Sequence, residues 1–334
     1  IILIPISTHA QFETREIAGP RPWTSLKAND SEESFQFAIV TDRTGGHRPG
    51  IFEDAVNKLN LLQPEFVVSV GDLIEGYTED REVLDAEWNE FNSFIDKLQM
   101  PFFYLPGNHD YTNEVMAREW KKRFGPDYYH FKYKDVLFLC LNSSGDMLKQ
   151  HKYFRQVLES EADVRWTFAF IHHPLFTYPD QVEWDKIEGL LVGRKHTVFS
   201  GHHHRYVKYR RNQSNYVVLA TTGGASPLRG DQFGEFDHVA WITMTEEGPI
   251  MANLKLDGIL DQDISTEETK TIVDNLHFGE MLKLDPIYCE NDSLSWGKTQ
   301  LKITNSADLP ASVNLSNVPS PYLITDLQDQ TVKM

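Results

Sequence analysis

The sequence has little cysteine, few basic residues and no long apolar run. Its two cysteines, Cys140 and Cys289, are too few for a disulfide scaffold or a cysteine-rich zinc site. Cys140 falls within an apolar run, which predicts a buried structural thiol. No stretch reaches the roughly 18–20 apolar residues that a membrane-spanning helix needs, so no transmembrane segment is expected.

Charge of one sign is also scarce. The 32 Lys and Arg residues are outnumbered by 49 Asp and Glu, which gives a formal net charge of −17. Because wrapping the phosphates of nucleic acid takes a basic face, this balance argues against non-specific nucleic-acid binding. It leaves room for a small cationic pocket that recruits a single phosphate.

The 334 residues, 40% hydrophobic and 24% charged, have a globular composition and suit one large or two modest domains. Residues 1–10 are apolar and end on a small residue, as the tail of a secretory signal does. We therefore expect a signal remnant and lead-in over residues 1–34 and a secreted or periplasmic location. The alternative is a frayed apolar N-terminus.

Residues 35–265 alternate short apolar runs with helical periods, which is typical of an α/β fold with a largely buried sheet. Helices are expected after Pro49-Gly50, over 84–98 and over 113–123. Strands are expected at 35–40, 66–70, 102–105, 128–133, 136–141, 166–171, 196–200, 216–221 and 238–245. Helical periodicity disappears over residues 270–334, where strands at 281–288, 299–304 and 311–315 predict a small, incomplete β-sandwich-like domain.

Side chains with the donors that divalent metals prefer follow five of these strands. They are, in chain order, Asp42, Asp72, Asn108-His109-Asp110, His172-His173 and His202-His203-His204. Each alone has an ordinary structural explanation, such as a helix cap or a turn, but five in succession do not. Open α/β sheets bind ligands at the carboxyl ends of their strands, and one carboxylate can bridge two metals about 3.5–4 Å apart. The pattern therefore predicts a metal site.

The series Gly71-Asp72, Gly107-Asn108-His109-Asp110, His172 and Gly201-His202-His203-His204, preceded by Asp42, resembles the calcineurin-like metallophosphoesterase superfamily over about residues 35–260. This resemblance implies a four-layer αββα sandwich with a dinuclear site at the sheet edge. It implies that Asp72 bridges the two metals. The other ligands that it implies are Asn108, His172 and His202 for one metal, and Asp42 and His204 for the other.

The resemblance also implies roles around the metals. His109 would protonate the leaving alkoxide or help to hold the phosphate, with Glu75 or Asp110 as the acid that orients it. Arg43 is a candidate phosphate anchor, because a guanidinium matches two phosphate oxygens, although a surface salt bridge explains it equally well. His173 is a candidate substrate-facing residue.

The first motif departs from the family pattern, because Thr44 stands where many relatives carry a histidine. Three completions of that metal site are open. Thr44 coordinates weakly or through water, His47 folds back over Gly45-Gly46 to supply the imidazole, or an extra water leaves a lower metal affinity. We favour water or Thr44.

The function expected is hydrolysis of a small phosphate ester, monoester or diester, by water activated at two divalent ions. Mixed Asp, Asn and His ligation suits Mn, Fe or Zn, and suits Mg less. Aromatic side chains near the motifs are candidates to line a leaving-group pocket: Tyr77, Tyr111, Phe176 and Tyr178. The alternative is a catalytically weak phospho-ligand binding protein, which Thr44 favours. A protein phosphatase ranks lower, because the acidic chain would repel acidic phosphopeptides. The sequence does not determine the oligomeric state.

Overall fold

The structure is a computed structural model. It describes residues 33–259 and, of the remainder, 272, 281–288, 296–305, 310, 312–316, 324 and 326–334. The chain divides into two compact units, residues 1–260 and 261–334. The expected signal remnant and most of the lead-in lie outside the described residues, so export stays a prediction.

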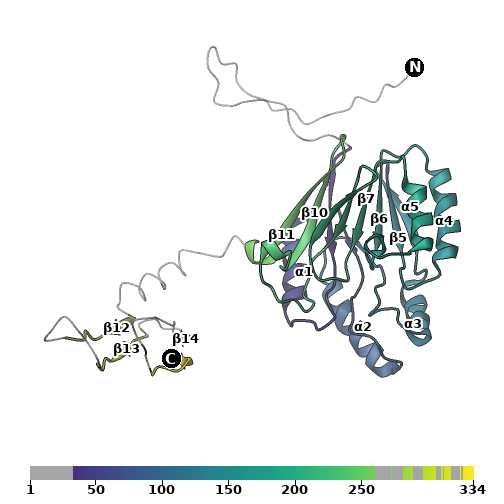
Figure 1. The fold of residues 1–334 in the computed structure, drawn as a ribbon. Helices are drawn as coiled ribbons and strands as arrows, with labels where there is room; N and C mark the ends of the chain where they lie inside the picture. Colours follow the sequence, from purple (N-terminus) through teal and green to yellow (C-terminus); the bar gives the residue numbers. More distant parts are fainter. Residues whose placement is uncertain are drawn as a thin grey trace, which may run out of the picture. The chain divides into compact units, whose positions relative to one another are not determined.

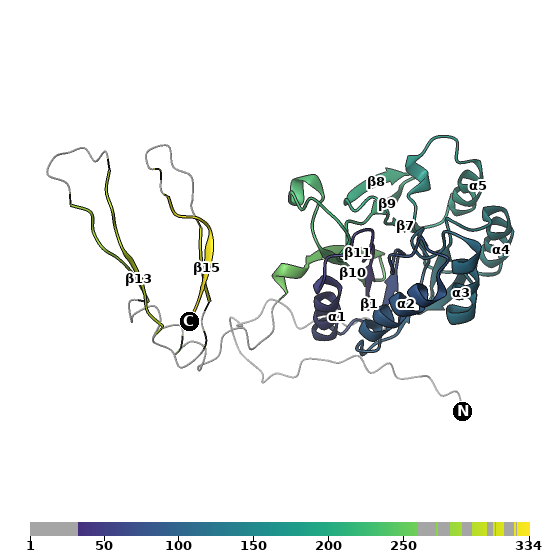
Figure 2. The same ribbon diagram turned by 90° about the horizontal axis from the view of Figure 1, so that it is seen from below.

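The first unit is built on two β-sheets (Figures 1 and 2). The five-stranded sheet has the order β11-β10-β1-β2-β3, and the six-stranded sheet has the order β4-β5-β6-β7-β9-β8. The strands of the first sheet are β1 (Phe35–Val40), β2 (Phe66–Ser69), β3 (Phe102–Phe103), β10 (His238–Met244) and β11 (Pro249–Lys255). Those of the second are β4 (Tyr129–Tyr133), β5 (Val136–Leu141), β6 (Trp166–Ile171), β7 (His196–Ser200), β8 (Val207–Arg211) and β9 (Ser214–Val218).

Parallel strands form the centre of both sheets. β1, β2 and β3 are parallel, as are β5, β6, β7 and β9, whereas β10, β11, β4 and β8 join in antiparallel fashion. In the register of the first sheet, Phe37 pairs with Phe66. Parallel neighbours end at the same edge of a sheet, so the loops after β1, β2 and β3 meet, as do those after β6 and β7.

Helices cover the outer face of each sheet, which gives four layers (Figure 1). α1 (Ile51–Leu62), α2 (Arg81–Ile95) and α3 (Glu114–Phe124) pack on the first sheet, and α4 (Met147–Ser160) and α5 (Val182–Leu191) pack on the second. The short helices are η1 (Leu175–Thr177), η2 (Asp231–Phe233) and η3 (Leu256–Gly258). The expected αββα sandwich is confirmed. Among the described helices, none has the length and apolar character needed to cross a membrane.

The central parallel strands are largely apolar, which suits their burial on both faces. In β5, Val136, Phe138 and Cys140 pack in the core between the sheets, while Leu137 and Leu139 pack under α4 and α5. This alternation follows from the two-residue period of a strand. Aromatic rings fill the inter-sheet core, as in the stacked pair Phe37–Phe66, whose centroids lie 5.2 Å apart.

Several elements differ from the sequence expectation. The helices α4 and α5 and the strands β8 and β11 were not predicted, and the strand expected at 216–221 lies at Ser214–Val218. β8 and β11 are edge strands with many exposed side chains, so they lack the apolar run that marks a buried strand.

The described strands of the second unit form two antiparallel pairs. β12 (Leu282–Leu284) pairs with β13 (Leu301–Ile303), and β14 (Ser312–Leu315) pairs with β15 (Gln330–Lys333). Strands were expected near the first three, and β15 was not. A β-rich domain over residues 270–334 stays a prediction, because most of this unit lies outside the described residues.

Burial makes a testable prediction for Cys140. This side chain is 1% exposed, and burial raises the pKa of its thiol to about 12, so almost no thiolate exists at pH 8. In a Cys289→Ser variant, which retains Cys140 as the single thiol, we expect no reaction with a disulfide reagent such as DTNB in the native state. Addition of guanidinium chloride should release one thiol per chain, and a fast native reaction would contradict the packing of β5.

Candidate metal centre

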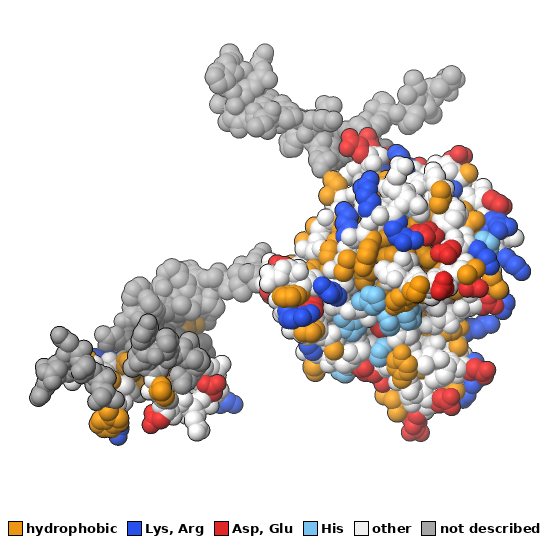
Figure 3. All heavy atoms as spheres, in the orientation of Figure 1, with side chains coloured by type: hydrophobic (Ala, Val, Ile, Leu, Met, Phe, Trp, Pro, Cys, Tyr) orange, Lys and Arg blue, Asp and Glu red, His pale blue; other side chains and the backbone are white. Residues whose placement is uncertain are grey.

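Residues from both sheets converge beyond the carboxyl ends of their parallel strands. Asp42 follows β1, Asp72 follows β2, His172 follows β6, and His202 and His204 follow β7. Histidine side chains gather on one face of the first unit (Figure 3). The strand-end positions that the sequence singled out are thus brought together.

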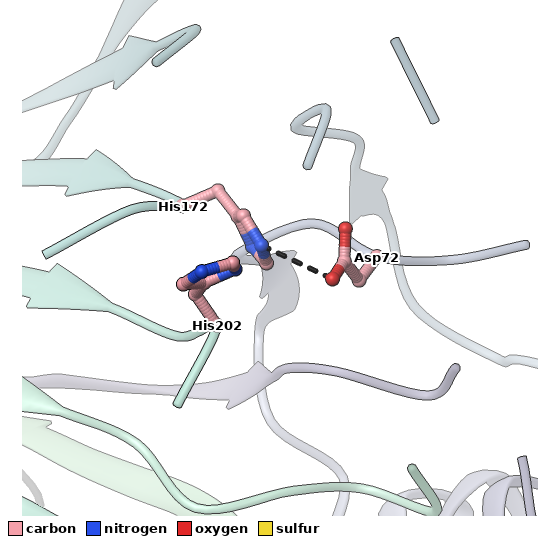
Figure 4. Close-up of side chains that lie close together, drawn as sticks. All are labelled: Asp72, His172 and His202. Carbon is pink, nitrogen blue, oxygen red and sulfur yellow. Dashed lines mark ion pairs between the residues drawn. The ribbon is translucent and has the colours of Figure 1, made fainter. Parts of the chain in front are cut away.

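Two groups of metal-ligand side chains share one carboxylate. Asp72, His172 and His202 form one group, and Asp42, Asp72 and His204 form the other. Within each group the ligand atoms all lie within 4.8 Å of one another. Asp72, His172 and His202 point toward one another in Figure 4, where the dashed line marks the 3.1 Å ion pair between His172 Nε2 and Asp72 Oδ2. A carboxylate common to two groups is the arrangement that bridges two cations.

Backbone carbonyls fix which ring nitrogen of the histidines faces the site. His172 Nδ1 donates to the carbonyl oxygen of Val70 at 2.9 Å, and His204 Nδ1 donates to that of Ala225 at 2.6 Å. Each ring therefore presents Nε2 to the carboxylates, and His204 Nε2 lies 3.4 Å from Asp42 Oδ1. Metal-binding histidines are commonly held in this way by their second ring nitrogen.

The donor chemistry fits a cation. In neutral His172 the Nε2 atom is an acceptor, and it faces Asn108 Oδ1 at 2.9 Å as well as the Asp72 oxygen. Asp42, Asp72 and His172 are all at most 1% exposed. Buried acceptors that face one another are unfavourable unless a proton or a cation lies among them. Carboxylate, amide and imidazole donors at this separation can surround a divalent ion at about 2.0–2.2 Å from each.

The pKa values of Asp72 and His172 also indicate that a positive charge is favoured at this site. Burial raises the pKa of Asp72, but the charge and hydrogen bond of His172 outweigh it and lower the pKa to about 2. Burial alone would lower the pKa of His172, yet Asp72 and Asp42 raise it to about 9. The carboxylates therefore stabilise a positive charge at the position of the His172 ring.

The backbone at these ligands is strained. Asp42, Asp72, His202 and His204 have φ values of 43°, 57°, 73° and 49°, in the left-handed region that non-glycine residues rarely adopt. Neighbouring segments hold them there. Asp42 N–H donates to the carbonyl oxygen of Gly71 at 3.1 Å, and Gly201 N–H donates to that of His172 at 2.9 Å. The strain is thus supported by contacts between loops of different strands.

Further contacts brace the Asp42 carboxylate, which is fully buried. It accepts hydrogen bonds from the Thr41 hydroxyl and, at 2.8 Å, from the backbone N–H of His202. The Thr221 hydroxyl and the Gly224 N–H donate to the Asp42 carbonyl oxygen at 2.7 and 2.9 Å. The sequence did not indicate these partners, because threonine hydroxyls at strand ends carry no distinctive pattern.

His109 is oriented differently from the expectation. Its Nδ1 donates to the backbone carbonyl oxygen of Glu75 at 2.7 Å, and the Glu75 carboxylate lies elsewhere. That carboxylate accepts from the N–H groups of Gly46 and His47 and pairs with His47 Nδ1 at 2.8 Å. Partial burial raises the pKa of Glu75, but the Thr44 hydroxyl and the His47 and Gly46 contacts lower it to about 2. The expected carboxylate–His109 pair is therefore replaced by a carbonyl–His109 pair.

Asp110, the second candidate to orient His109, is a buried brace between loops. Its carboxylate accepts from the N–H groups of Leu73 and Ile74, at 2.9 and 3.1 Å, and from that of Gly107 at 2.8 Å. Burial and the nearby Asp72 raise its pKa to about 7. Asp110 thus ties the loop after β2 to the loop after β3 and does not contact the His109 ring in the described structure.

The Arg43 guanidinium contacts α2 in this structure. It pairs with Glu90 at 2.7 Å, donates to the carbonyl oxygen of Leu73 at 3.1 Å and lies 5.3 Å from the Phe94 ring centroid. The side chain is only 5% exposed. In this structure α2 holds the guanidinium against its own aromatic and acidic side chains, and a role of Arg43 as a phosphate anchor stays a prediction. The salt bridge that the sequence offered as the alternative is present, between a buried Arg43 and a Glu90 side chain that is 49% exposed.

Of the two side chains that could replace the missing imidazole, His47 lies outside the second group in this structure. His47 pairs with Glu75, and among the described residues neither metal-ligand group includes it. Thr44 is fully buried, and its N–H donates to the Asp72 carbonyl oxygen at 3.2 Å. Its hydroxyl oxygen is buried and makes no hydrogen bond of normal geometry among the described residues. Coordination by Thr44 or by water stays a prediction.

His173 lies beside the first group. Its ring centroid is 4.1 Å from that of His202, and its Nδ1 lies 2.7 Å from the Ser143 hydroxyl. Burial and the neighbouring His172 and His202 lower its pKa to about 3, so the ring is neutral. Its contact with substrate stays a prediction.

The family model for calcineurin-like phosphoesterases matches residues 35–206, about half of the chain. The chain is 30% identical to serine/threonine-protein phosphatase CPPED1 of Mus musculus over 197 residues, which cover 51% of this chain and 62% of that protein. The Bos taurus protein of the same name is also 30% identical, with the same coverage. The chain thus spans 62% of the length of these curated relatives.

Solved structures share the fold at low identity. A purple acid phosphatase from yellow lupin (Lupinus luteus) seeds is 15% identical with a TM-score of 0.55, covering 68% of this chain and 52% of that one. A dimetal phosphatase from Danio rerio is 13% identical with a TM-score of 0.50, covering 66% of this chain and 96% of that one.

The close approach of two loops predicts a strict need for glycine at position 201. A Cβ there would overlap the Asp42 carboxylate and the Thr41 hydroxyl. We expect Gly201→Ala to lower metal affinity by about 10–100-fold, the range seen when groups that orient ligands are altered. Metal content after dialysis against Mn²⁺ measures this. Gly189→Ala on α5 is the control, because a Cβ there meets nothing within 4 Å; equal metal content in both variants would contradict the arrangement.

The pairing of His47 with Glu75 predicts that His47 is not a ligand. A His47→Ala variant should bind as many metal ions, with an affinity within about twofold, as the unaltered chain. Titration of metal-stripped protein with Mn²⁺ tests this beside His204→Ala, which should lose one ion. Loss of an ion from His47→Ala would mean that the ring leaves Glu75 when metal binds.

Proposed function

The chain belongs to the calcineurin-like phosphoesterase family, and we propose that it is a metal-dependent phosphoric ester hydrolase that acts on phosphate monoesters. The observation that carries the proposal is the buried Asp72 carboxylate, which is shared by two groups of metal-ligand side chains. When bound, two divalent ions at these groups would lower the pKa of a coordinated water and offset the charge of the phosphate.

His109 is the residue that we propose as the proton donor. Its Nδ1–H donates a hydrogen bond to the Glu75 carbonyl oxygen, so Nε2 is the ring nitrogen left for the reaction. A Cβ built at Gly45 would lie 3.5 Å from His109 Nε2 and 3.0 Å from His204 Cε1, so both rings flank this residue. A protonated His109 can therefore give its Nε2 proton to the departing ester oxygen beside the second metal-ligand group.

The monoester preference is drawn from the relatives. CPPED1 is named a serine/threonine-protein phosphatase, and phosphoserine is a monoester. Against a phosphoprotein substrate stands the net charge of −17, which would repel an acidic phosphopeptide. A small phosphorylated molecule therefore suits the chain better, and a phosphoserine peptide belongs in the substrate panel.

The second candidate function is that of a catalytically weak protein that binds a phosphorylated ligand. Thr44 favours it, because this position brings a hydroxyl where many family members have an imidazole. The presence of Asn108 and His109, with Asn108 Oδ1 turned toward His172, favours the enzyme.

Hydrolysis of p-nitrophenyl phosphate and bis(p-nitrophenyl) phosphate by Mn²⁺-loaded protein tests the proposal. We expect turnover of the monoester to exceed that of the diester. His109→Ala should lower kcat by about 10²–10⁴-fold, the usual contribution of a positioned acid, with metal content unchanged. His151→Ala on α4, outside the metal-ligand groups, is the matched control and should behave as the unaltered chain.

The outcomes separate the candidates. Faster hydrolysis of the diester than of the monoester would contradict the proposed preference for monoesters. Two bound metals without turnover of either ester or of the phosphoserine peptide would favour the binding protein. Turnover that survives His109→Ala would remove this residue from the proton-donor role.

A further inference from the structure

An aromatic ring stands exposed beside His109. Tyr77 lies in the loop after β2, and its side chain is 56% exposed, among the large apolar or aromatic side chains left open to solvent. Its ring is perpendicular to that of His109, with centroids 4.6 Å apart and an interplanar angle of 88°. The ring therefore borders the side of the site on which the proton donor stands.

The Tyr77 ring is held in place although it is exposed. Its hydroxyl oxygen accepts a hydrogen bond from Asn108 Nδ2 at 2.8 Å. This bond also fixes the amide of Asn108, whose Oδ1 then faces His172 Nε2 at 2.9 Å. The Tyr77 side chain thus has two contacts: its hydroxyl bonds Asn108, a candidate metal ligand, and its ring borders the space beside His109.

The backbone at Tyr77 is in a conformation that tyrosine rarely adopts, since its φ of 50° lies in the left-handed region. Gly76 before it has a φ of 59°, and a Cβ at Gly76 would overlap the His109 carbonyl oxygen. The Gly76 N–H donates to Glu87 on α2 at 2.9 Å. A strained backbone that keeps an aromatic ring in solvent, next to a proton donor, points to a function for the ring.

The other aromatic candidates from the sequence lie elsewhere. Phe176 is buried in the core under α5, and Tyr111 packs against the core beneath α1 to α3. The Tyr178 hydroxyl lies 2.9 Å from His203 Nε2, on the His202 side of the centre. Among the described ring contacts, Tyr77 is the one of the four that touches His109.

We propose that the Tyr77 ring forms a wall of the leaving-group pocket and gives the enzyme a preference for aryl phosphate esters, in which an aromatic ring is attached to the ester oxygen. This inference rests on the proposed function. In the reaction, the water oxygen forms a bond to phosphorus and the P–O(aryl) bond breaks. The aryl oxygen leaves with a proton from His109, one proton of the water stays on the phosphate and the other is returned to His109, so the products are a phenol and inorganic phosphate. A ring on the oxygen that His109 protonates would lie against Tyr77 and gain an aromatic contact.

Binding of two phosphonates separates this role from catalysis. Phenylphosphonate and methylphosphonate, which are not hydrolysed, are titrated calorimetrically into Mn²⁺-loaded protein. We expect phenylphosphonate to bind about tenfold more tightly, in keeping with one aromatic contact. Tyr77→Ala should reduce this preference to within about twofold. Equal affinities in the unaltered chain, or an unchanged preference in Tyr77→Ala, would overturn the proposal.

Two further variants keep the test specific. Tyr77→Phe removes the hydroxyl and retains the ring, so it should keep the preference for phenylphosphonate even where Mn²⁺ affinity falls through Asn108. Tyr178→Ala should also keep it. Loss of the preference in Tyr77→Phe would assign the effect to the Asn108 amide and overturn the role of the ring.

Kinetics distinguish this inference from the proposed function. Phenyl phosphate should show a lower KM than glycerol 2-phosphate, and Tyr77→Ala should raise the KM of phenyl phosphate about tenfold while that of glycerol 2-phosphate stays within about twofold. A phosphonate preference without any turnover would overturn the hydrolase and leave the aryl subsite standing. Turnover with equal KM values would overturn the aryl subsite and leave the hydrolase standing.

Discussion

The first unit depends on a concentration of buried acceptor groups around Asp72. Two buried aspartates, the buried His172, an asparagine oxygen and the partly exposed His202 and His204 converge there. Such a set is unfavourable unless positive charge lies among its members. The raised pKa of His172 and the lowered pKa of Asp72 show that a protonated His172 is favoured beside the carboxylates. Two divalent cations would supply more positive charge than this one proton.

The sandwich stabilises this convergence because the ligands follow several different strands, each fixed in a packed core. The central parallel strands are largely apolar on both faces, so their ends are fixed by two cores. The strained ligands are then held by hydrogen bonds between loops, such as His202 N–H to Asp42 Oδ1 and His109 N–H to Asp72 Oδ1. Strain in one loop is therefore offset by contacts that belong to other strands.

Around the acceptors, backbone groups do much of the orienting that carboxylates were expected to do. Carbonyl oxygens of Val70, Glu75 and Ala225 each receive an Nδ1–H, from His172, His109 and His204 in turn. A carbonyl fixes the tautomer as well as a carboxylate does and adds no further negative charge to an acidic centre. The Glu75 carboxylate is thereby released to order the loop that carries Gly46 and His47.

The α/β alternation and the candidate metal ligands could be predicted from the sequence, whereas the four layers were implied only by the family resemblance. Apolar strands mark themselves by composition, and the donors directly after β1, β2, β3, β6 and β7 are placed by strand order alone. The directions of the Arg43, Glu75, His47 and Tyr77 side chains became evident only from the folded chain. The physical reason is that a loop side chain takes its direction from partners distant in the chain. Glu90 on α2 holds Arg43, and Asn108 holds the Tyr77 hydroxyl, and neither contact leaves a periodic trace in the sequence.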